Sequence, residues 1–544
     1  MAVKINFNEA AAKTHTALIQ NERAMTKSLL RLSTGYRILN AADDSAGLFI
    51  ADMLGTVASA LDQGNRNIQT GISALQIAET NAGQIYTKLQ EIYIRAQNAA
   101  NDINDPNARQ ALQNEINNFI DAIQKIATDT EYNGIKLLDG TFTSKSIHYG
   151  PRKDQTISVT ISSLKATDIG AYIAQGDGKT ASVTATTTND FSTWILSQSA
   201  YYINSEDYFK VNGIDVLGTA NNMVDVSVIA NNINNNDTLK GESIEATATN
   251  TSTASTAFSK VASIDYTGSA TSDSAIVTLK LHFYVGEDTS ADFSITAPSV
   301  TFSGSGAKPS QYIFTDLDDL ISEINTQASN NDVNIVATES NGKLVLQTTN
   351  GETIAIAAEL DVTIGGSATV NATVNLDQLL ENASSATTGN ITSSATQYAH
   401  AVKIGDLTIG GIDNFTVEHS GIGSSTEGIG MASGTDAVTR SSLYDIDVTS
   451  NTGAELAIMI ATKALQKVDT VRAEIGATMN NLQSIYDAQK SAYDNTKEAE
   501  SVIRNTDYAK EMSEFISYQI RIQATIAMLA QANALPQLVL QLLR

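Results

Sequence analysis

The 544-residue chain contains no cysteine, and this absence removes several classes of site at once. Without thiols the chain can form no disulfide framework, no thiolate metal site and no cysteine nucleophile. Proline and tryptophan are also scarce, with five prolines and one tryptophan in the whole chain. Only 17% of the residues are charged, so serine, threonine, asparagine and glutamine must carry most of the solvated surface.

Positive charge is the next deficit. The 34 lysine and arginine residues face 59 aspartate and glutamate residues, which gives a net charge of −25 and a pI near 4.5. A protein that binds a phosphate backbone needs a cationic face. The composition therefore predicts no nucleic-acid partner.

Long apolar runs are missing too. The first thirty residues contain no signal-peptide core, because charged residues interrupt them, among them Lys4, Glu9, Lys13, Glu22 and Arg23. No stretch approaches the roughly 20 apolar residues that cross a bilayer. We therefore expect no membrane span, and if the protein leaves the cell, a route that does not cleave a leader.

The sequence shows no catalytic or metal-binding pattern. None of the five histidines has a glutamate and a second histidine at the spacing of a zinc protease. The glycine-rich stretch at 421–430 lacks the Lys-Ser/Thr of a phosphate loop. Asp43 and Asp44 are better explained as acidic residues at the start of a long helix, where they meet the helix dipole. We expect no enzyme activity, no metal and no cofactor.

The two ends and the middle differ in composition. Residues 5–130 and 452–544 are rich in alanine, leucine, isoleucine, glutamine and glutamate, whereas 133–450 is rich in threonine, serine, glycine and valine in short alternating runs. This contrast predicts helices outside and strands inside. The expected fold class is a multidomain α + β protein, in which N- and C-terminal helices form a long coiled-coil or bundle core around a central β-rich insertion.

A heptad pattern supports the bundle. Two columns of apolar residues or glycine, four residues apart and repeated every seven, run from Ile50 to Ala99 over about fifty residues. Their small members, among them Gly64 and Gly71, predict close approach between helices. The seam residues expected from this pattern and from a matching C-terminal stripe are Ile50, Leu54, Val57, Leu61, Ile68, Leu75, Leu89, Ile475 and Leu482. A further helix is expected after Asp105 and Pro106, with Leu112, Ile116, Phe119, Ile123 and Ile126 on its apolar side.

Both chain ends carry a separate apolar stripe. Near the N-terminus, Ala11, Leu18, Met25 and Leu32 recur every seven residues beside Leu29; near the C-terminus the stripe contains Tyr508, Met512, Phe515, Ile522, Ile526 and Leu529. One helix pair of this size is marginal alone. Either both ends dock on the bundle, or copies of the same chain cover them. Polymerisation explains better why both extreme ends carry the pattern.

Three separated segments resemble the bacterial flagellins. Residues 30–38 and 41–51 read LRLSTGYRI and AADDSAGLFIA, residues 468–477 read VDTVRAEIGA, and the third segment reads LAQANALPQ from Leu529 and ends at Arg544. The likeness covers about residues 1–170 and 440–544. It implies a structural subunit of the extracellular flagellar filament that polymerises with itself. Hook-associated junction and cap proteins, the flagellar export apparatus and a flagellin chaperone are the further partners implied.

The resemblance also implies a layout. Residues 1–42 and 505–544 would form an inner helical domain that lines the filament channel, and 43–170 with 445–504 a helical-bundle domain with a small β-hairpin near residues 156–163. Residues 171–444 would form a variable, surface-exposed, β-rich region. The inner-core residues expected to mediate polymerisation are Leu18, Met25, Leu29, Leu32, Arg37, Ile522, Ile526, Leu529, Asn533, Pro536, Leu540 and Arg544.

One departure from the family pattern concerns recognition by the animal Toll-like receptor for flagellin. Many flagellins carry a basic residue after the Leu-Gln that matches Leu89 and Gln90, but here Glu91 follows, and the later pair reads Ile94-Arg95. Glu115 matches the family's acidic residue on the next helix. Reversing a charge at the centre of an interface costs several kcal/mol, so we expect weak recognition.

The middle region shows a possible repeat. Tyr208–Ile214 leads to Val228–Asn234, and a similar order of strand, helix and hairpin follows around residues 315–348. Two modules at about 200–250 and 275–357 resemble the flagellin IN motif, named after its Ile-Asn. The sequence leaves the fold of residues 360–440 open.

Two alternative functions stay open at this point. A hook–filament junction protein has similar termini but usually lacks the Leu-Pro-Gln ending. A filament subunit with an added adhesin role would bind a host glycan or surface through its central region. For the adhesin reading, the aromatic run from Trp194 to Tyr208 is the segment to test.

Overall fold

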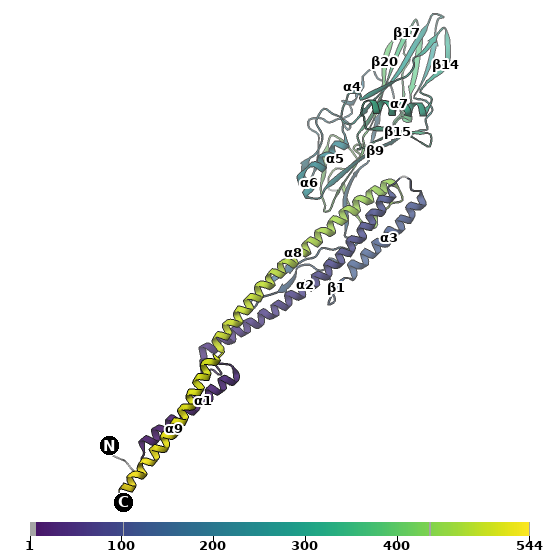
Figure 1. The fold of residues 1–544 in the computed structure, drawn as a ribbon. Coiled ribbons are helices and arrows are strands. Elements are labelled where there is room, and N and C mark those ends of the chain that lie inside the picture. Colours follow the sequence, from purple (N-terminus) through teal and green to yellow (C-terminus); the bar gives the residue numbers. More distant parts are fainter. Residues whose placement is uncertain (1–6, 102, 435–436, 543–544) are drawn as a thin grey trace. The chain divides into compact units, whose positions relative to one another are not determined.

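The computed structural model describes residues 7–101, 103–434 and 437–542, with side chains up to residue 534. The chain divides into two compact units (Figure 1). The first, which we call the helical unit, comprises residues 1–81, 130–162 and 471–544. The second, the β-rich unit, comprises residues 82–129 and 163–470.

Long helices form at both chain ends, as the composition predicts. Their bounds are α1 Glu9–Thr34, α2 Ser45–Ala99, α3 Pro106–Asp129, α8 Asn451–Arg504 and α9 Tyr508–Leu542. Side-chain caps set several starts: Asp44 accepts a hydrogen bond from the Gly47 amide at 2.9 Å, and Asp105 accepts one from the Ala108 amide at 2.6 Å. The expected capping roles of Asp44 and Asp105 are therefore confirmed.

Within the helical unit, α2 and α8 run antiparallel. Glu79 of α2 pairs with Arg472 of α8 at 3.1 Å, and Asp52, almost thirty residues earlier, pairs with Arg504 at 3.4 Å. Between them the Tyr486 hydroxyl accepts a hydrogen bond from Gln69 at 3.0 Å. Leu61, Ile68, Leu75, Ile475 and Leu482 are all buried in this unit, so these members of the predicted seam do form a core.

Two hairpins belong to the helical unit. β1 (Glu131–Tyr132) pairs with β2 (Ile135–Lys136) through Asn133 and Gly134, whose φ values of 51° and 76° suit the tight turn that Asn-Gly favours. β3 (Lys145–His148) pairs with β4 (Thr156–Val159), with Ile147 opposite Ile157. The second hairpin is the one expected near residues 156–163.

The glycines of the predicted seam have another purpose than the close helix approach we expected. A Cβ at Gly64 would overlap the carbonyl group of Tyr149, and one at Gly71 would meet the Ile147 side chain. Asn67, between them, donates to the His148 carbonyl at 2.9 Å. The absence of side chains at these two glycines therefore leaves a shallow track on the surface of α2, against which the β3–β4 hairpin packs.

α2 also has a property that the sequence analysis did not anticipate. Among the described helices it is the one that is long and apolar enough, by length and composition, to cross a membrane. Its apolar residues are spread by heptads, with polar residues such as Gln63, Asn65 and Arg66 between them, so no unbroken run was visible. Length and composition alone do not establish a span, and the buried seam described above places one side of α2 in a protein core.

The β-rich unit contains three larger sheets. One has the order β14-β10-β18-β19, a second β12-β11-β17-β20-β6 with β13 also on β11, and a third β15-β16-β9-β21-β5-β25. The bounds are β5 Gly170–Gly176, β6 Thr180–Ser182, β9 Glu245–Thr253, β10 Ala262–Gly268, β11 Ser274–Val285, β12 Phe293–Thr296, β13 Val300–Ser303, β14 Gly306–Ile313, β15 Ile335–Ser340, β16 Lys343–Thr348, β17 Ile354–Gly365, β18 Thr369–Val374, β19 Ala386–Thr387, β20 Ala395–Lys403, β21 Asp406–Gly411 and β25 Val438–Ser442.

Smaller elements complete this unit. β22 pairs with β7, which pairs with β8, and β23 pairs with β24. Their bounds, with those of the short helices, are α4 Phe191–Ile195, β7 Tyr208–Val211, β8 Ile214–Asp215, α5 Val226–Asn235, α6 Asp237–Gly241, α7 Leu317–Asn330, η1 Leu376–Gln378, β22 Val417–Ser420, β23 Gly423–Ser424, β24 Glu427–Gly428 and η3 Leu443–Asp445. About half of the described residues between 360 and 440, whose fold the sequence left open, thus lie in strands.

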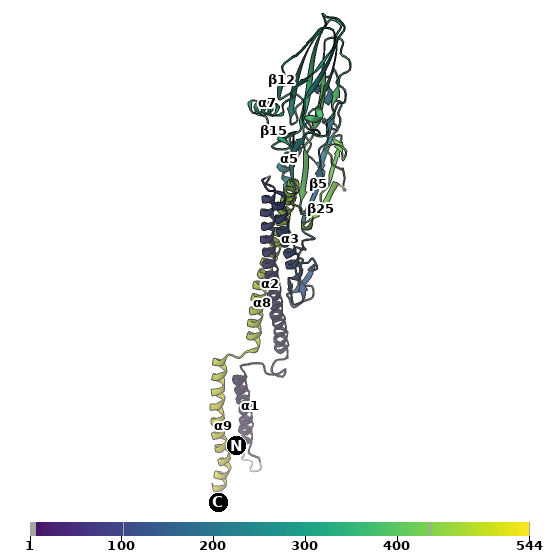
Figure 2. The same ribbon diagram turned by 90° about the vertical axis from the view of Figure 1, so that its right-hand side faces the viewer.

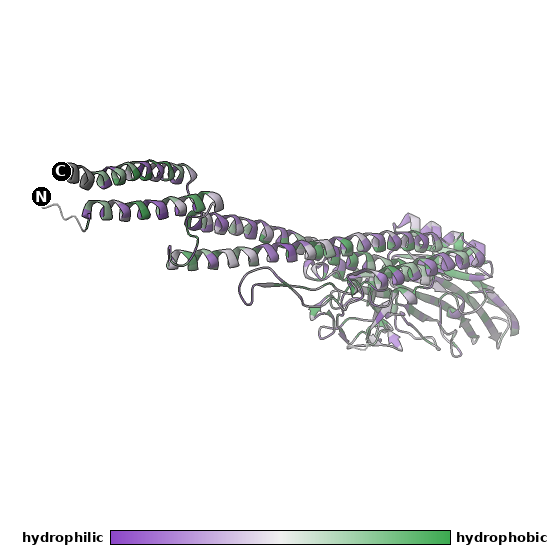
Figure 3. Ribbon diagram, turned by 90° about the horizontal axis from the view of Figure 1, so that it is seen from below, coloured by the Kyte–Doolittle hydropathy of each residue, from purple (hydrophilic) through white to green (hydrophobic). Residues whose placement is uncertain are grey.

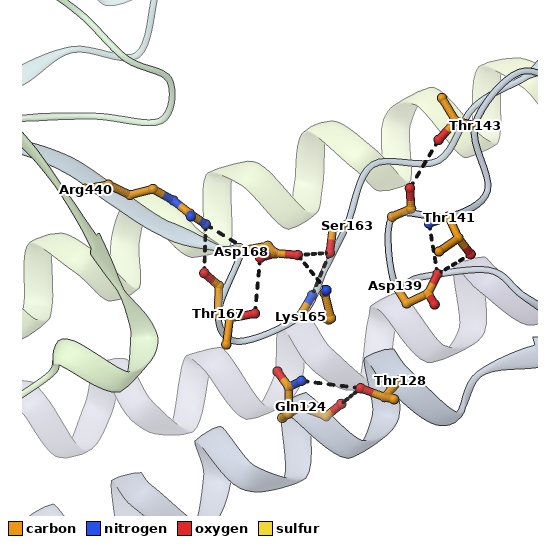
Figure 4. Close-up of polar contacts among 11 residues, drawn as sticks. Gln124, Thr128, Asp139, Thr141, Thr143, Ser163, Lys165, Thr167, Asp168 and Arg440 are labelled. Atoms are coloured by element: carbon orange, nitrogen blue, oxygen red, sulfur yellow. Dashed lines mark hydrogen bonds and ion pairs between the residues drawn. The ribbon is translucent and has the colours of Figure 1, made fainter.

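The strands that lead into and out of the insertion lie side by side. β5 pairs antiparallel with β25, from Gly170 opposite Ser442 to Ala174 opposite Val438. Just before β5, Asp168 accepts hydrogen bonds from Ser163 at 2.6 Å and Thr167 at 3.1 Å and pairs with Lys165 at 3.2 Å (Figure 4). Burial alone would raise the pKa of Asp168, but these partners outweigh it and hold the pKa below its usual value. Arg440 of β25 donates to the Thr167 carbonyl at 2.8 Å and pairs with Asp168 at 4.0 Å, so the two connecting segments are fastened to one another.

The two suspected repeats share a detailed arrangement. Asp225 caps α5 and Asp316 caps α7. Nine residues after each cap, the side-chain amide of an asparagine makes two hydrogen bonds to one backbone residue. The Asn234 side chain accepts from the Ala246 N–H at 2.9 Å and donates to the Ala246 carbonyl at 2.7 Å. The Asn325 side chain accepts from the Ala337 N–H at 2.8 Å and donates to the Ala337 carbonyl at 2.9 Å. Each asparagine therefore latches its helix to the first residues of the following strand, β9 or β15.

Candidate assembly interface

The α1 and α9 helices form an antiparallel pair that joins the two ends of the described chain (Figures 1 and 2). Asn8 donates to the Ala532 carbonyl at 2.8 Å, and at the opposite end of the pair the Tyr508 hydroxyl donates to the Leu32 carbonyl at 2.7 Å. Asn21 reaches Thr525 at 3.4 Å in between. These contacts fix the register of the two helices over the length of α1.

A polar cluster lies within this pair. Glu511 is only 6% exposed and pairs with Arg31 at 3.6 Å, while Ser28 donates to the Glu511 carbonyl at 3.3 Å. One carboxylate oxygen of Glu511 and the Nε of Arg31 have no hydrogen-bond partner. Because a buried charge without full pairing is costly, this cluster opposes any other register of α1 on α9.

The connection after α1 is held by three residues. Asp43 forms a short ion pair with Lys27 at 2.5 Å and accepts a hydrogen bond from the Leu39 amide at 3.1 Å. Both contacts lower the pKa of Asp43, and the contact with Lys27 has the larger effect. Arg37 donates to the Ile503 carbonyl at 2.8 Å. Asp43 therefore fastens this connection and does not cap α2, which corrects the sequence interpretation for that residue.

Part of the α9 surface that α1 leaves uncovered is apolar. Met512, Ile516 and Ile520 follow at four-residue spacing and are neighbours on the helix surface. Tyr508, whose hydroxyl reaches α1, and Ile526 lie beside them. These five side chains are between 48% and 60% exposed, and Figure 3 shows apolar positions recurring along both helices. Completing their burial would contribute on the order of 5 kcal/mol. We call these five residues the α9 stripe.

The predicted inner-core residues divide between the pair and the stripe. Leu18, Met25, Leu32, Ile522 and Leu529 are half-buried, whereas Leu29, Arg37, Ile526 and Asn533 are exposed. Pro536 and Leu540 lie in α9, but their side chains are outside the described residues, as is Arg544 entirely. Ile516 and Ile520 were missed, although their spacing from Met512 is the signal that would have found them.

The predicted bundle seam is only partly closed. Leu89 is buried in the β-rich unit, and five further members are buried in the helical unit as described above. Ile50 is 49% exposed, and Leu54 and Val57 are half-buried. Phe49 and Met53 beside them are 67% and 54% exposed. The first turns of α2 therefore present a second uncovered apolar surface in the helical unit.

The residues matched to the receptor region lie in the β-rich unit on α2 and α3. Arg95 pairs with Glu91 and with Glu115, each at 2.8 Å, and its guanidinium lies 5.7 Å from the centre of the Phe119 ring. Gln90 is exposed, and Ile94 is 50% exposed. The one basic side chain of this group is thus occupied by two carboxylates of its own chain.

The aromatic run of the central region is part of a core. Trp194, Tyr201 and Tyr202 are 8%, 5% and 7% exposed, and Phe191 is buried with them. Phe191 stacks on Tyr284 at 4.0 Å and Trp194 on His400 at 5.1 Å between ring centres. These rings pack inside the protein, so they form no exposed platform for a glycan.

Comparison with known proteins agrees with the motif pattern. Residues 5–143 match the family model described as the bacterial flagellin N-terminal helical region, and residues 458–543 match that of the C-terminal helical region. The flagellin of Aquifex aeolicus (strain VF5) is 47% identical, and that of Aquifex pyrophilus 46% identical, each over the full length of both chains.

A solved structure also resembles the chain. FliC from Burkholderia pseudomallei matches 76% of this chain and 99% of its own, with 14% identity and a TM-score of 0.27. At that score the match does not bear on the fold. The similarity that counts is the one in sequence, which extends through the central region as well as the two helical ends.

Proposed function

The chain belongs to the bacterial flagellin family and is a non-enzymatic structural subunit of the extracellular flagellar filament, and we propose that its copies join through the α9 stripe and the exposed start of α2. The uncovered stripe is the observation that carries this proposal. A single chain leaves it half exposed along α9, and the stripe repeats on every copy of the chain. A second copy is therefore a partner that every subunit can provide.

The proposed layers of the filament follow the sequence expectation. Residues 1–42 and 505–544 line the channel, 43–170 with 445–504 surround them, and 171–444 face the solvent. The distribution of charge supports this order: residues 163–470 contain 12 basic and 35 acidic residues. Like charges of that density are best tolerated where water and counter-ions reach them.

Further partners are proposed from the same surfaces. Before assembly, the flagellar export apparatus and a flagellin chaperone handle a chain whose α9 stripe is uncovered, and the chaperone shields that stripe. At the two ends of the filament, hook-associated junction and cap proteins take the place of a neighbouring copy. Competition between the chaperone and filament growth would test this, since a chaperone bound elsewhere leaves elongation unchanged.

Seeded elongation tests the assembly proposal directly. Replacing two stripe residues, Ile516→Glu and Ile520→Glu, places charges where a neighbouring copy must bury apolar surface, so elongation on filament seeds should stop. The matched control is Arg521→Glu, about 100° around α9 from Ile520, which should elongate nearly as well as the native chain. Light scattering and electron microscopy report growth, and circular dichroism checks the fold. Normal filaments from the double variant would refute the proposal.

We also propose weak recognition by the animal Toll-like receptor for flagellin. The support is Glu91, which stands where many flagellins carry a basic residue, and Arg95, which Glu91 and Glu115 hold. In a reporter-cell assay the soluble monomer should activate poorly, and Glu91→Arg should increase potency at least about 10-fold, since a reversed interfacial charge costs several kcal/mol. Glu418→Arg, an equal charge change on exposed β22, is the control. Potent activation by the native monomer would contradict the proposal.

A further inference from the structure

Three side chains on neighbouring strands of the β-rich unit form a continuous hydrogen-bonded row. Ser294 of β12 lies directly opposite His282 of β11, with its Oγ 2.6 Å from the His282 Nδ1. The other ring nitrogen, Nε2, lies 3.1 Å from a carboxylate oxygen of Glu359 on β17. The order β12-β11-β17 in the sheet sets hydroxyl, imidazole and carboxylate side by side.

The charges around this row decide where its protons lie. Lys280 donates to the other oxygen of Glu359 at 2.9 Å. Burial raises the pKa of Glu359, but the hydrogen bonds from Lys280 and His282 outweigh it and leave the pKa below its usual value. An ionised carboxylate only accepts hydrogen bonds, so Nε2 of His282 carries the hydrogen. In the neutral imidazole Nδ1 is then the acceptor, and the Ser294 hydroxyl donates to it; this tautomer is assigned from the hydrogen-bond network.

The hydroxyl end of the row is exposed to solvent, and the other two side chains are largely shielded. Ser294 is exposed, whereas the side chains of His282 and Glu359 are only 20% and 18% exposed. β12 is also the last strand on its side of the sheet. A reagent in solution can therefore reach the hydroxyl, while the imidazole behind it is partly shielded and held in place.

We propose that Ser294 is an activated nucleophile and an acylation site of the outer, β-rich part of this flagellin. A hydroxyl hydrogen-bonded to a neutral imidazole, which is itself oriented by a carboxylate, is the arrangement that activates serine in covalent catalysis. Compared with the usual hydrolase triad, the two ring nitrogens exchange roles. Either nitrogen can accept a proton when the other carries the hydrogen.

The acylation needs an activated ester and no other reagent. Ser294 Oγ attacks the carbonyl carbon of an activated ester, and a new Oγ–C bond forms as the bond to the leaving alkoxide breaks. The hydroxyl proton passes to Nδ1 of His282 and then to the leaving alkoxide. Because the row lies on the face of a sheet, we expect a single acylation for each chain and no turnover, in keeping with a structural protein.

The other titratable groups near the row permit this step at neutral pH. On the same side of the sheet lie Lys280, Asp361 and Tyr398, with His400 and Asp190 further along. Burial keeps His400 neutral by lowering its pKa to about 4. Lys280 is the nearby cation, and Glu359 neutralises it.

The test uses the full soluble chain, p-nitrophenyl acetate and a fluorophosphonate probe, with peptide mass mapping of the product. Ser299 is the internal control, because it is exposed but its hydroxyl meets the Thr278 hydroxyl, at 2.8 Å, and no imidazole. A positioned general base contributes about 100-fold or more, so Ser294 should be modified at least about 100-fold faster than Ser299.

Variants separate activation from simple exposure. Ser294→Ala should abolish modification at this site, and His282→Gln should slow it about 100-fold, while Glu359→Gln should have a smaller effect. Equal rates at Ser294 and Ser299 in the native chain would overturn the proposal, and that comparison does not depend on any variant folding. A His282→Gln chain that reacts at the native rate would overturn it as well.

Discussion

The helical unit and the β-rich unit differ in net charge and in the amount of exposed apolar surface. The helical unit holds 18 basic and 18 acidic residues, whereas the β-rich unit holds 16 basic and 41 acidic, so the whole net charge of −25 lies in the second. Among the described residues, 16 of the 23 exposed large apolar side chains are in the helical unit, although it is the smaller of the two. In the proposed assembly, the unit that meets copies of itself is neutral and apolar, and the unit that faces the solvent is anionic and closed.

Their interiors differ in the same sense. The β-rich unit completes two apolar cores, one around β10, β11, β17, β18 and α7 and the other around α4, α5 and β21. In the helical unit the seam between α2 and α8 is closed only in part, and α9 keeps its stripe exposed. The β-rich unit therefore buries its apolar cores within one chain, whereas the helical unit would bury its remaining apolar surface in the proposed assembly.

The largest expected effect is on how the stability of the β-rich unit depends on pH. Burial lowers the pKa of His400 to about 4, so between pH 6.5 and 4 the unfolded chain binds a proton that the native chain does not, and stability falls as pH falls. Burial raises the pKa of Asp225 to about 6, so between pH 6 and 3.8 the native chain binds the extra proton, and stability rises as pH falls. Each change is worth about 3 kcal/mol, and in the native protein the two should nearly cancel.

Replacing either residue alone should reveal the contribution of the other to the pH dependence of stability. Asp225→Asn should make the β-rich unit lose about 3 kcal/mol between pH 6.5 and 4, and His400→Gln should make it gain a similar amount over the same range. Denaturant unfolding at several pH values measures both. If the two variants show the same pH dependence as the native protein, the two buried groups do not act as described.

The next effect concerns the helical unit. Gly64→Ala should displace the β3–β4 hairpin, because the new methyl group would overlap the Tyr149 carbonyl group, and should lower the free energy of unfolding by about 1–3 kcal/mol. Gly83 lies in the same helix with no atom within 4 Å of an added Cβ, and Gly83→Ala should stabilise the chain by up to about 1 kcal/mol. Equal effects at the two glycines would show that the hairpin does not need its track.

The smallest effect compares the two repeats within the β-rich unit. Asn234→Ala and Asn325→Ala each remove two hydrogen bonds to the backbone of the following strand, and each should cost about 1–3 kcal/mol. Asn331, which bonds a carbonyl only within its own helix end, is the control and should cost much less. Thermal unfolding distinguishes them, and a cost at one latch alone would show that the repeats are not equivalent.

Much of the fold could be predicted from the sequence because its signals are local. The heptads of α2, the Asp105–Pro106 start of α3 and the alternation in β4 each depend on neighbours within a few turns or residues. The role of Gly64 and Gly71 could not be read this way. A glycine in a heptad column fits a close helix contact and a crossing hairpin equally well, and only the position of Tyr149, 85 residues later in the chain, decides between them.

The same limit applies to the candidate interface. The apolar spacing of α1 and α9 predicted that both ends carry stripes, but not which residues face each other. The buried Glu511 cluster and the contacts of Asn8 and Tyr508 set that register, and they join residues about 480 to 520 positions apart. Ile516 and Ile520 were overlooked because the seven-residue repeat passes over them, although both follow Met512 at four-residue spacing.

The pairing of β5 with β25 has a consequence for how such a protein can change. Since the chain leaves the insertion beside the point where it arrived, loops, strands or whole modules between residues 176 and 438 can be added or removed without altering the distance the flanking segments must bridge. The region behaves as an exchangeable cassette. In the proposed filament, lineages can remodel this region while the segments that build the shaft stay under separate selection.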